Sequence, residues 1–181
     1  MSREWPALDY EAWSASCDTL HAHTQVLGKL AATLAPPEPQ LQHAALRLSA
    51  RGWETLPLPA PDGSGALVVA LDLHAHEAVA EHSDGRRERV ALTPDRAVAE
   101  VTRELLAAVR SLAGNVEIDP TPQEAAWTVP LDEDTEHASS QGGAAGGLLL
   151  QDGHRPVPVG VPAAARPARR RRGHGLRRRG P

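Results

Sequence analysis

Apolar and small residues recur with helical spacing near the start of the chain. They occupy positions 13, 17, 20, 24, 27, 31 and 34, in alternating steps of four and three residues. This spacing places them along one face of an α-helix. Asp9 is a suitable N-cap, and the proline-rich run that begins at Pro36 ends the helix. The pattern therefore predicts an amphipathic helix over residues 9–34.

Apolar and polar positions alternate in the segment that follows. The alternation over residues 41–50 predicts a half-buried strand. Residues 53–58 fit an edge strand, because Pro57 and Pro59 cannot donate hydrogen bonds to a central ladder. We expect these two segments to pair across a turn at Gly52.

Three further segments predict strands. Residues 66–73 form the most apolar strand candidate in the chain. Residues 77–82 and 87–92 flank Asp84 and Gly85, a dipeptide that is typical of a hairpin turn. The middle of the chain is therefore expected to form antiparallel strands.

A second helix is predicted over residues 93–113. Thr93 is a suitable N-cap, and Pro94 occupies the favoured first position. Apolar residues at positions 98, 101, 105, 109 and 112 form its buried stripe, and Gly114 ends it. A short strand is expected over residues 116–118. This order of elements indicates an α+β fold, with a mainly antiparallel sheet and two helices packed on one face.

Composition changes abruptly near residue 141. Residues 141–181 consist mainly of Gly, Ala, Pro and Arg and show no periodicity. Such a segment buries too little apolar surface to offset the entropy of the chain, so we expect a disordered tail. We therefore divide the chain into an α+β domain over residues 1–140 and a disordered basic C-terminal tail.

The formal net charge of −4 conceals two opposite charges. Residues 151–181 contain nine Arg and one acid, a charge of +8, which leaves −12 on residues 1–150. An arginine cluster attracts phosphate electrostatically, so non-specific nucleic acid is a candidate partner. The cluster consists of Arg169, Arg170, Arg171, Arg172, Arg177, Arg178 and Arg179.

Cysteine count and apolar run length bear on the location of the protein. Cys17 is the single cysteine, so no disulfide can form within the chain. The N-terminal residues lack the apolar core of a signal peptide, and no apolar run is long enough to span a bilayer. The sequence therefore predicts a cytoplasmic protein without a membrane span.

Several short stretches, taken in order along the chain, match the pattern of one bacterial family. They are WPAL (5–8), TLH (19–21), TQVLGK (24–29), LAPP (34–37), SARGW (49–53), HSDGR (82–86) and LDEDTEHAS (131–139). Over residues 4–139 the chain resembles domain-of-unknown-function family 5996. The resemblance implies a genuine folded domain, and it supplies no catalytic, binding or cofactor residues.

The resemblance ends where the basic tail begins. Members of the family continue beyond this point and are richer in Phe and Tyr, whereas this chain has no Phe. A frameshift near codon 140 would explain the change and would leave the domain truncated. The alternative is that the tail is a natural disordered segment.

A His-x-His pair suggests a metal site. His74 and His76 would point to the same side of a strand, Asp72 is close in sequence, and His137 belongs to an acidic motif. Imidazole and carboxylate groups suit zinc or non-haem iron. A divalent metal held by Asp72, His74, His76 and His137 is therefore one hypothesis. Separate histidines on the surface or in hydrogen bonds are the alternative, and no cofactor is predicted.

Two groups of polar residues are candidates for catalysis. His21, Gln25 and Lys29 share one face of the first helix and could offer a base, an amide and a cation. The alternative is a solvated stripe beside the apolar one. The motif DEDTEH at residues 132–137 is the densest polar cluster.

The acidic motif has two interpretations. Glu133, Asp134 and Glu136 could perform acid–base chemistry or bind a cation. The same residues are typical of a helix N-terminus, with Asp134 or Thr135 as the cap. Sequence alone leaves both interpretations open.

These observations favour an uncharacterised bacterial binding or interaction module. A small metal-dependent or acid–base enzyme that uses His and carboxylate groups is the first alternative. A nucleic-acid-associated protein that acts through the arginine cluster is the second. The function of the protein is thus unknown at the level of the sequence.

Overall fold

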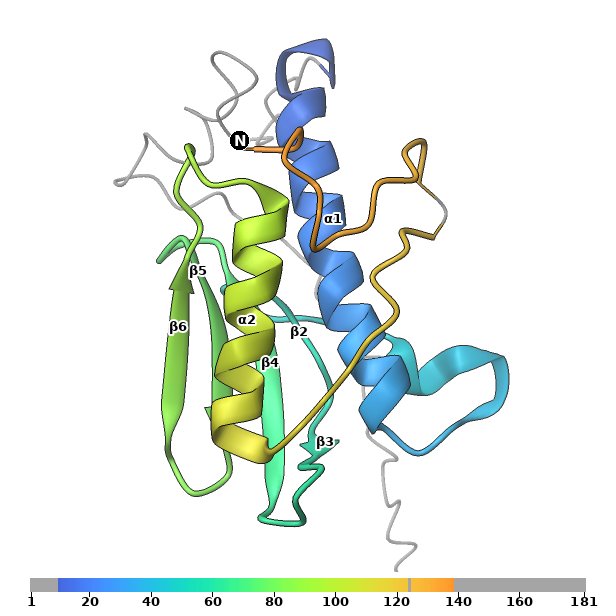
Figure 1. Cartoon of the computed structure of the whole chain (residues 1–181), viewed down its shortest axis with the longest axis vertical. Helices are drawn as coiled ribbons and strands as arrows, with labels where there is room; N and C mark the ends of the chain where they lie inside the picture. Colours follow the sequence, from blue (N-terminus) through green and yellow to red (C-terminus); the bar gives the residue numbers. More distant parts are fainter. Residues whose placement is uncertain (1–9, 124, 139–181) are drawn as a thin grey trace, which may run out of the picture.

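The computed structural model describes residues 10–123 and 125–138 (Figure 1). The predictions for residues 141–181, including disorder, nucleic-acid binding and the frameshift, lie outside the described residues. The elements of the described part are α1 (Tyr10–Leu34), the 3-10 helix η1 (Pro39–Ala44), β1 (Arg47–Leu48), β2 (Gly52–Glu54), β3 (Leu58–Pro59), β4 (Ala66–Asp72), β5 (Glu77–His82), β6 (Arg87–Ala91) and α2 (Val98–Ala113).

The strands form one antiparallel sheet of six strands. Its order is β1-β2-β4-β5-β6, and β3 pairs with the beginning of β4 while β2 pairs with its end. Every pairing is antiparallel. The structure therefore confirms the predicted α+β class.

Thr55 fills the interval between β2 and β3 along β4. Its N–H donates to the carbonyl oxygen of Val69 at 2.9 Å, and its hydroxyl accepts from the N–H of Val69 at 3.1 Å. The side chain of Thr55 is fully buried, so this hydroxyl replaces a missing main-chain acceptor. The chain can therefore bend after Thr55 without leaving β4 unpaired.

Both α-helices cover the same face of the sheet (Figure 1). Leu67, Val69 and Leu71 alternate along β4 and are buried toward the helices. They pack in one core with Leu30 of α1 and Leu105 of α2. Burial of such side chains contributes about 1.5–3 kcal/mol each, so this interface holds the layers together.

The predicted strand over residues 41–50 is wrong. Most of its first half forms η1, in which Gln40 and Leu41 have φ angles of 58° and 57°. The N–H of Glu38 donates to Nδ1 of buried His43 at 3.0 Å. This bond turns the segment back onto α1, and only two residues of the predicted range, those of β1, join the sheet.

The second helix begins later than its sequence predicts. Thr93 lies in a turn, where its carbonyl oxygen accepts from the N–H of Arg96 at 3.1 Å. The helix begins at Val98, and its N-cap, Ala97, offers no side-chain hydrogen bond. The predicted end is confirmed: Gly114 has a φ angle of 94°, and its N–H donates to the carbonyl oxygen of Arg110.

The predicted strand at residues 116–118 pairs with no strand in the part of the chain that the structure describes. Val116 is nevertheless buried, and its carbonyl oxygen accepts from Nε of Arg110 at 3.0 Å. From there the chain runs back along α1 (Figure 1). This return brings residues 125–138 to the start of α2.

Candidate functional site

The first half of α1, which we take as residues 10–23, buries polar side chains. Ser16, Thr19 and His23 are all more than nine-tenths buried, and their spacing places them on one face of the helix. The second half of α1 buries Val26 and Leu30 instead. One half of the helix therefore contributes polar side chains to the interior, and the other half contributes apolar side chains.

Residues 134–138 close the N-terminus of α2. The N–H of Val98 donates to the carbonyl oxygen of His137, and that of Ala99 donates to the carbonyl oxygen of Asp134, both at 2.9 Å. Ala97 and Ala138 form an isolated antiparallel bridge. These contacts satisfy amides that a helix cannot pair by itself, so this segment supplies the cap that Ala97 lacks.

The side chain of Asp134 organises this turn. It is completely buried, and Oδ1 accepts from the N–H groups of Glu136 and His137 at 3.0 Å. Its other oxygen, Oδ2, lies 2.7 Å from Nδ1 of His137. The carboxylate therefore fixes the orientation of this imidazole and leaves Nε2 of His137 as the nitrogen that can serve another molecule.

Trp127 lies between two histidines. Its ring centroid is 4.5 Å from that of His137, at an interplanar angle of 39°, and 5.6 Å from that of His21, at 80°. The first contact is a tilted stack and the second is edge-to-face. We call His21, Trp127, Asp134 and His137 the His–Trp cluster.

Gln25 joins the cluster to α1. Its Nε2 lies 3.3 Å from Nε2 of His21, and its Oε1 accepts from the N–H of Gln123 at 2.8 Å. One glutamine therefore orients His21 and also anchors the segment that carries Trp127.

His23 is a neutral base near the cluster. Its side chain is 6% exposed, and burial lowers its pKa from 6.5 to about 4. The negative charge of Asp134 acts in the opposite direction and offsets only part of this effect. His23 therefore carries no charge at neutral pH.

Buried polar atoms without partners occur on the three segments that meet here. Among the described residues they are Ser16 Oγ, Thr102 Oγ1, Trp127 Nε1 and Asp132 Oδ1. Ser16 lies two turns before His23 on α1, and Thr102 lies one turn after the capped start of α2. Such atoms are rare, and each costs about 1–3 kcal/mol when it is desolvated without a partner.

The structure brings together some of the predicted site residues. His21 and Gln25 of the predicted helix face lie beside Asp134 and His137 of the acidic motif, with Trp127 between the histidines. These contacts join two groups that the sequence could only present separately.

Three other predicted site residues, Lys29, Glu133 and Glu136, lie outside the His–Trp cluster. Lys29 lies near Asp119, whose pKa is lowered chiefly by hydrogen bonds from Thr121 and to a smaller extent by Lys29. Glu133 and Glu136 are exposed. Asp134 follows the pattern of a cap, because it accepts from the amides two and three residues later, but residues 135–138 form no helix.

Three of the predicted metal ligands, Asp72, His74 and His76, lie at the turn between β4 and β5, whereas His137 lies in the segment that caps α2. Asp72 Oδ1 accepts from the N–H groups of His74 and Ala75, so it closes the turn between β4 and β5. His74 is exposed, and His76 has a φ angle of 56°. Within residues 10–123 and 125–138, no group of three or more His, Cys, Asp or Glu side chains is arranged to hold a metal ion.

Sequence reasoning missed four polar or aromatic members of this site. They are Ser16, His23, Thr102 and Trp127. The signal that could have found two of them is their position on the apolar-facing side of a helix. Ser16 and Thr102 lie on helix faces whose other residues are buried, so the pattern predicts an apolar residue at both positions.

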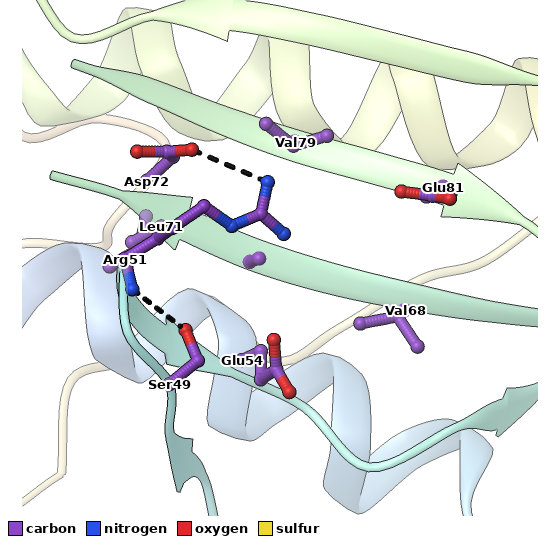
Figure 2. Close-up of a pocket in the computed structure, with 9 residues that line it drawn as sticks. Ser49, Arg51, Glu54, Val68, Leu71, Asp72, Val79 and Glu81 are labelled. Carbon is purple, nitrogen blue, oxygen red and sulfur yellow. Dashed lines mark hydrogen bonds and ion pairs between the residues drawn. The ribbon is translucent and has the colours of Figure 1, made fainter. Parts of the chain in front are cut away.

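The face of the sheet that the helices leave uncovered has a small hollow (Figure 2). Its volume is about 30 Å³, room for a few water molecules at most. Figure 2 shows Arg51 extending over the strands toward Asp72, and their nearest nitrogen and oxygen atoms are 3.4 Å apart. Glu54 and Glu81 in its wall already pair with Arg47 and Arg87. This hollow is therefore a small polar depression in a surface covered by ion pairs.

Among the described residues, no helix combines the length and the apolar character that are needed to cross a membrane.

Comparison with known proteins yields one match. The model of the family of unknown function DUF5996 matches residues 5–148. This match extends nine residues beyond the end of the resemblance seen in the sequence. Neither the curated proteins nor the solved structures provide a match to the chain.

Proposed function

The chain belongs to DUF5996, and since that family has no assigned function, we propose from the site itself that the domain binds a small polar molecule at the His–Trp cluster. The observation that carries this proposal is an oriented imidazole with unpartnered polar atoms on the segments around it. The ligand would hydrogen-bond to Nε2 of His137 and to one or more of those atoms.

The unpartnered atoms favour binding over a purely structural role. Valine has nearly the shape of threonine and would fill the position of Thr102 without a buried hydroxyl. Phenylalanine would likewise provide a ring at Trp127 without a buried N–H donor. A cluster that only packed the helices together would be more stable with these apolar groups.

The donors and acceptors define the class of ligand. The indole N–H can only donate, the carboxylate oxygen of Asp132 can only accept, and the hydroxyls of Ser16 and Thr102 can do either. A small molecule with both hydroxyl or amine donors and carbonyl or hydroxyl acceptors would satisfy this set. A purely apolar ligand would leave the same atoms unpaired.

A second function, acid–base catalysis, is favoured by the contact between Asp134 and His137. A carboxylate 2.7 Å from one imidazole nitrogen is the arrangement that fixes the tautomer of a general base. His137 would then transfer a proton at Nε2 of its ring. Binding is required for both functions, so the test of binding comes first.

The experiment uses the indole N–H signals of the full-length chain. The sequence has four Trp, so a sample labelled with ¹⁵N-tryptophan gives few signals, and Trp127→Phe identifies the relevant one. Acetate, phosphate, methylammonium, glycerol, glucose and adenosine are titrated separately into the millimolar range. We expect at least one probe to shift the Trp127 signal saturably while the Trp53 signal stays in place.

His137→Ala provides the specificity test, with His74→Ala as the matched control at an exposed histidine. The shift should disappear in His137→Ala and persist in His74→Ala. The proposal is wrong if no probe moves the Trp127 signal, or if both variants respond as the wild-type chain does.

A further inference from the structure

A second site lies at the other end of α2. Two turns meet there, one between β3 and β4 and one between β5 and β6 (Figure 1). The N–H of Asp62 donates to the carbonyl oxygen of Ala113 at 3.1 Å, and Arg86 donates to that of Leu112 at 2.9 Å. Both turns are therefore fixed to the C-terminus of α2.

A serine, a histidine and an aspartate form a continuous chain across these turns. Ser64 Oγ lies 3.1 Å from Nε2 of His82, and Nδ1 of His82 lies 3.0 Å from Oδ1 of Asp84. A base within hydrogen-bond reach of a hydroxyl, and itself oriented by a third group, is the arrangement of an activated nucleophile. Ser64, His82 and Asp84 occupy the corresponding positions here.

The exposure of the three side chains suits this arrangement. The side chain of His82 is only 1% exposed, whereas Ser64 is exposed to solvent. The imidazole is thus shielded, and the hydroxyl that it contacts can meet another molecule. Asp84 is half exposed and also pairs with Arg86 at 2.7 Å, which holds its carboxylate in place.

Gly65 allows the imidazole to approach the loop. Its φ angle is 153°, and a Cβ atom at this position would lie 3.2 Å from Nε2 of His82 and even closer to Oγ of Ser83. Any other residue would clash with Ser83 and would crowd the ring of His82. The loop is therefore built around close contact with His82.

Asp62 competes for the hydroxyl proton of Ser64. Its Oδ1 accepts from Ser64 Oγ at 2.5 Å and from the N–H of Ser64 at 2.9 Å. The hydroxyl has one proton, so it can donate either to Asp62 or to Nε2 of His82. The N–H of Asp84 donates to Nδ1 of His82 at 3.3 Å, which fits the first arrangement. In the second arrangement Nδ1–H of His82 donates to Oδ1 of Asp84 instead, and the serine is activated.

We propose that Ser64, His82 and Asp84 form a nucleophilic site that accepts acyl groups from small activated esters. Ser64 Oγ attacks the acyl carbon, its proton passes to Nε2 of His82, and the alkoxide or phenolate leaves with that proton. Water then attacks the acyl-serine through the same histidine, which restores the hydroxyl and releases the acid. The site is independent of the His–Trp cluster.

The experiment treats the full-length chain with a fluorophosphonate probe, which bonds to an activated serine with loss of fluoride. Labelled peptides are identified by mass spectrometry, and release of p-nitrophenol from p-nitrophenyl acetate gives a rate. The variants are Ser64→Ala, His82→Gln and Asp62→Asn, with Ser111→Ala as the control at an exposed serine on α2. Circular dichroism establishes that each variant is folded.

We expect labelling at Ser64, no label there in Ser64→Ala, and an unchanged rate in Ser111→Ala. Labelling should fall by at least about tenfold in His82→Gln, because general-base assistance is lost. It should rise in Asp62→Asn, because the carboxylate no longer holds the hydroxyl. Absence of label at Ser64 in both wild type and Asp62→Asn, or labelling that survives in His82→Gln, would overturn the proposal and leave these residues a structural staple between two turns.

Discussion

Both halves of α1 place side chains in the interior, yet they bury different kinds of side chain. The later half packs Val26, Leu27 and Leu30 into the core beneath the sheet face, and these residues have no polar side-chain atoms. The earlier half buries Ser16 and His23 next to segments that carry unpartnered polar atoms. The later half therefore stabilises the fold by apolar packing. The earlier half instead places polar groups in the interior, at a cost in stability.

Truncating a buried side chain in the apolar half of α1 should have the largest effect on stability. Leu30→Ala removes a completely buried side chain and leaves a cavity, so the free energy of unfolding should fall by about 2–5 kcal/mol. Urea denaturation at neutral pH measures the change. A loss as small as that of an exposed substitution such as Leu41→Ala, where the side chain is 67% exposed, would contradict the comparison.

Acid should have the second-largest effect on stability, through the polar half of α1. The pKa of His23 is about 4 in the folded chain and 6.5 as its ordinary value, so the unfolded chain binds the proton more readily. The contribution of uncharged His23 to the free energy of unfolding is complete above pH 6.5, and it is lost as the pH falls toward 4. The loss attributable to His23 should be about 2–3 kcal/mol by pH 4.5.

His23→Gln separates this effect from the titration of carboxyl groups. Urea denaturation of both chains is measured between pH 7 and pH 4.5. The variant should lose less stability than the wild-type chain over this range. Parallel curves for the two chains would show that His23 does not contribute.

Removing an unpartnered hydroxyl should have the smallest effect on stability and the opposite sign. Thr102→Val keeps the shape of a completely buried side chain and removes a hydroxyl without a partner among the described residues. The free energy of unfolding should stay constant or rise by up to about 1 kcal/mol. Thermal unfolding provides the measurement, and a clear loss of stability would show that the hydroxyl is paired in solution.

Much of the fold was predictable because its strongest signals are local. The hairpin of β5 and β6 follows from Asp84 and Gly85, and the end of α2 follows from Gly114. The strand predicted over residues 41–50 failed because the contact of Glu38 with His43 turns that segment onto α1. Such a tertiary contact leaves no periodic trace in the sequence.

The candidate site was only partly predictable for a related reason. Asp134 and His137 belong to a dense polar motif, and His21 shares a helix face with Gln25 and Lys29, so sequence alone marks all three as candidates. Ser16 and Thr102 resemble surface residues until the packing shows that they are buried. Trp127 lies in an irregular segment, where no pattern indicates that two histidines will flank it.

The cap of α2 has a consequence for the order in which the protein is made. Asp134 and His137 follow Ala99 and Val98, whose amides they bind, by 35 and 39 residues. During synthesis the first turn of the helix is therefore made well before its own cap. Its first turn can close only when the later segment has returned along α1, a non-local step of the kind that slows folding. The capping turn, the last described segment to be synthesised, thus completes both the helix and the His–Trp cluster in one event.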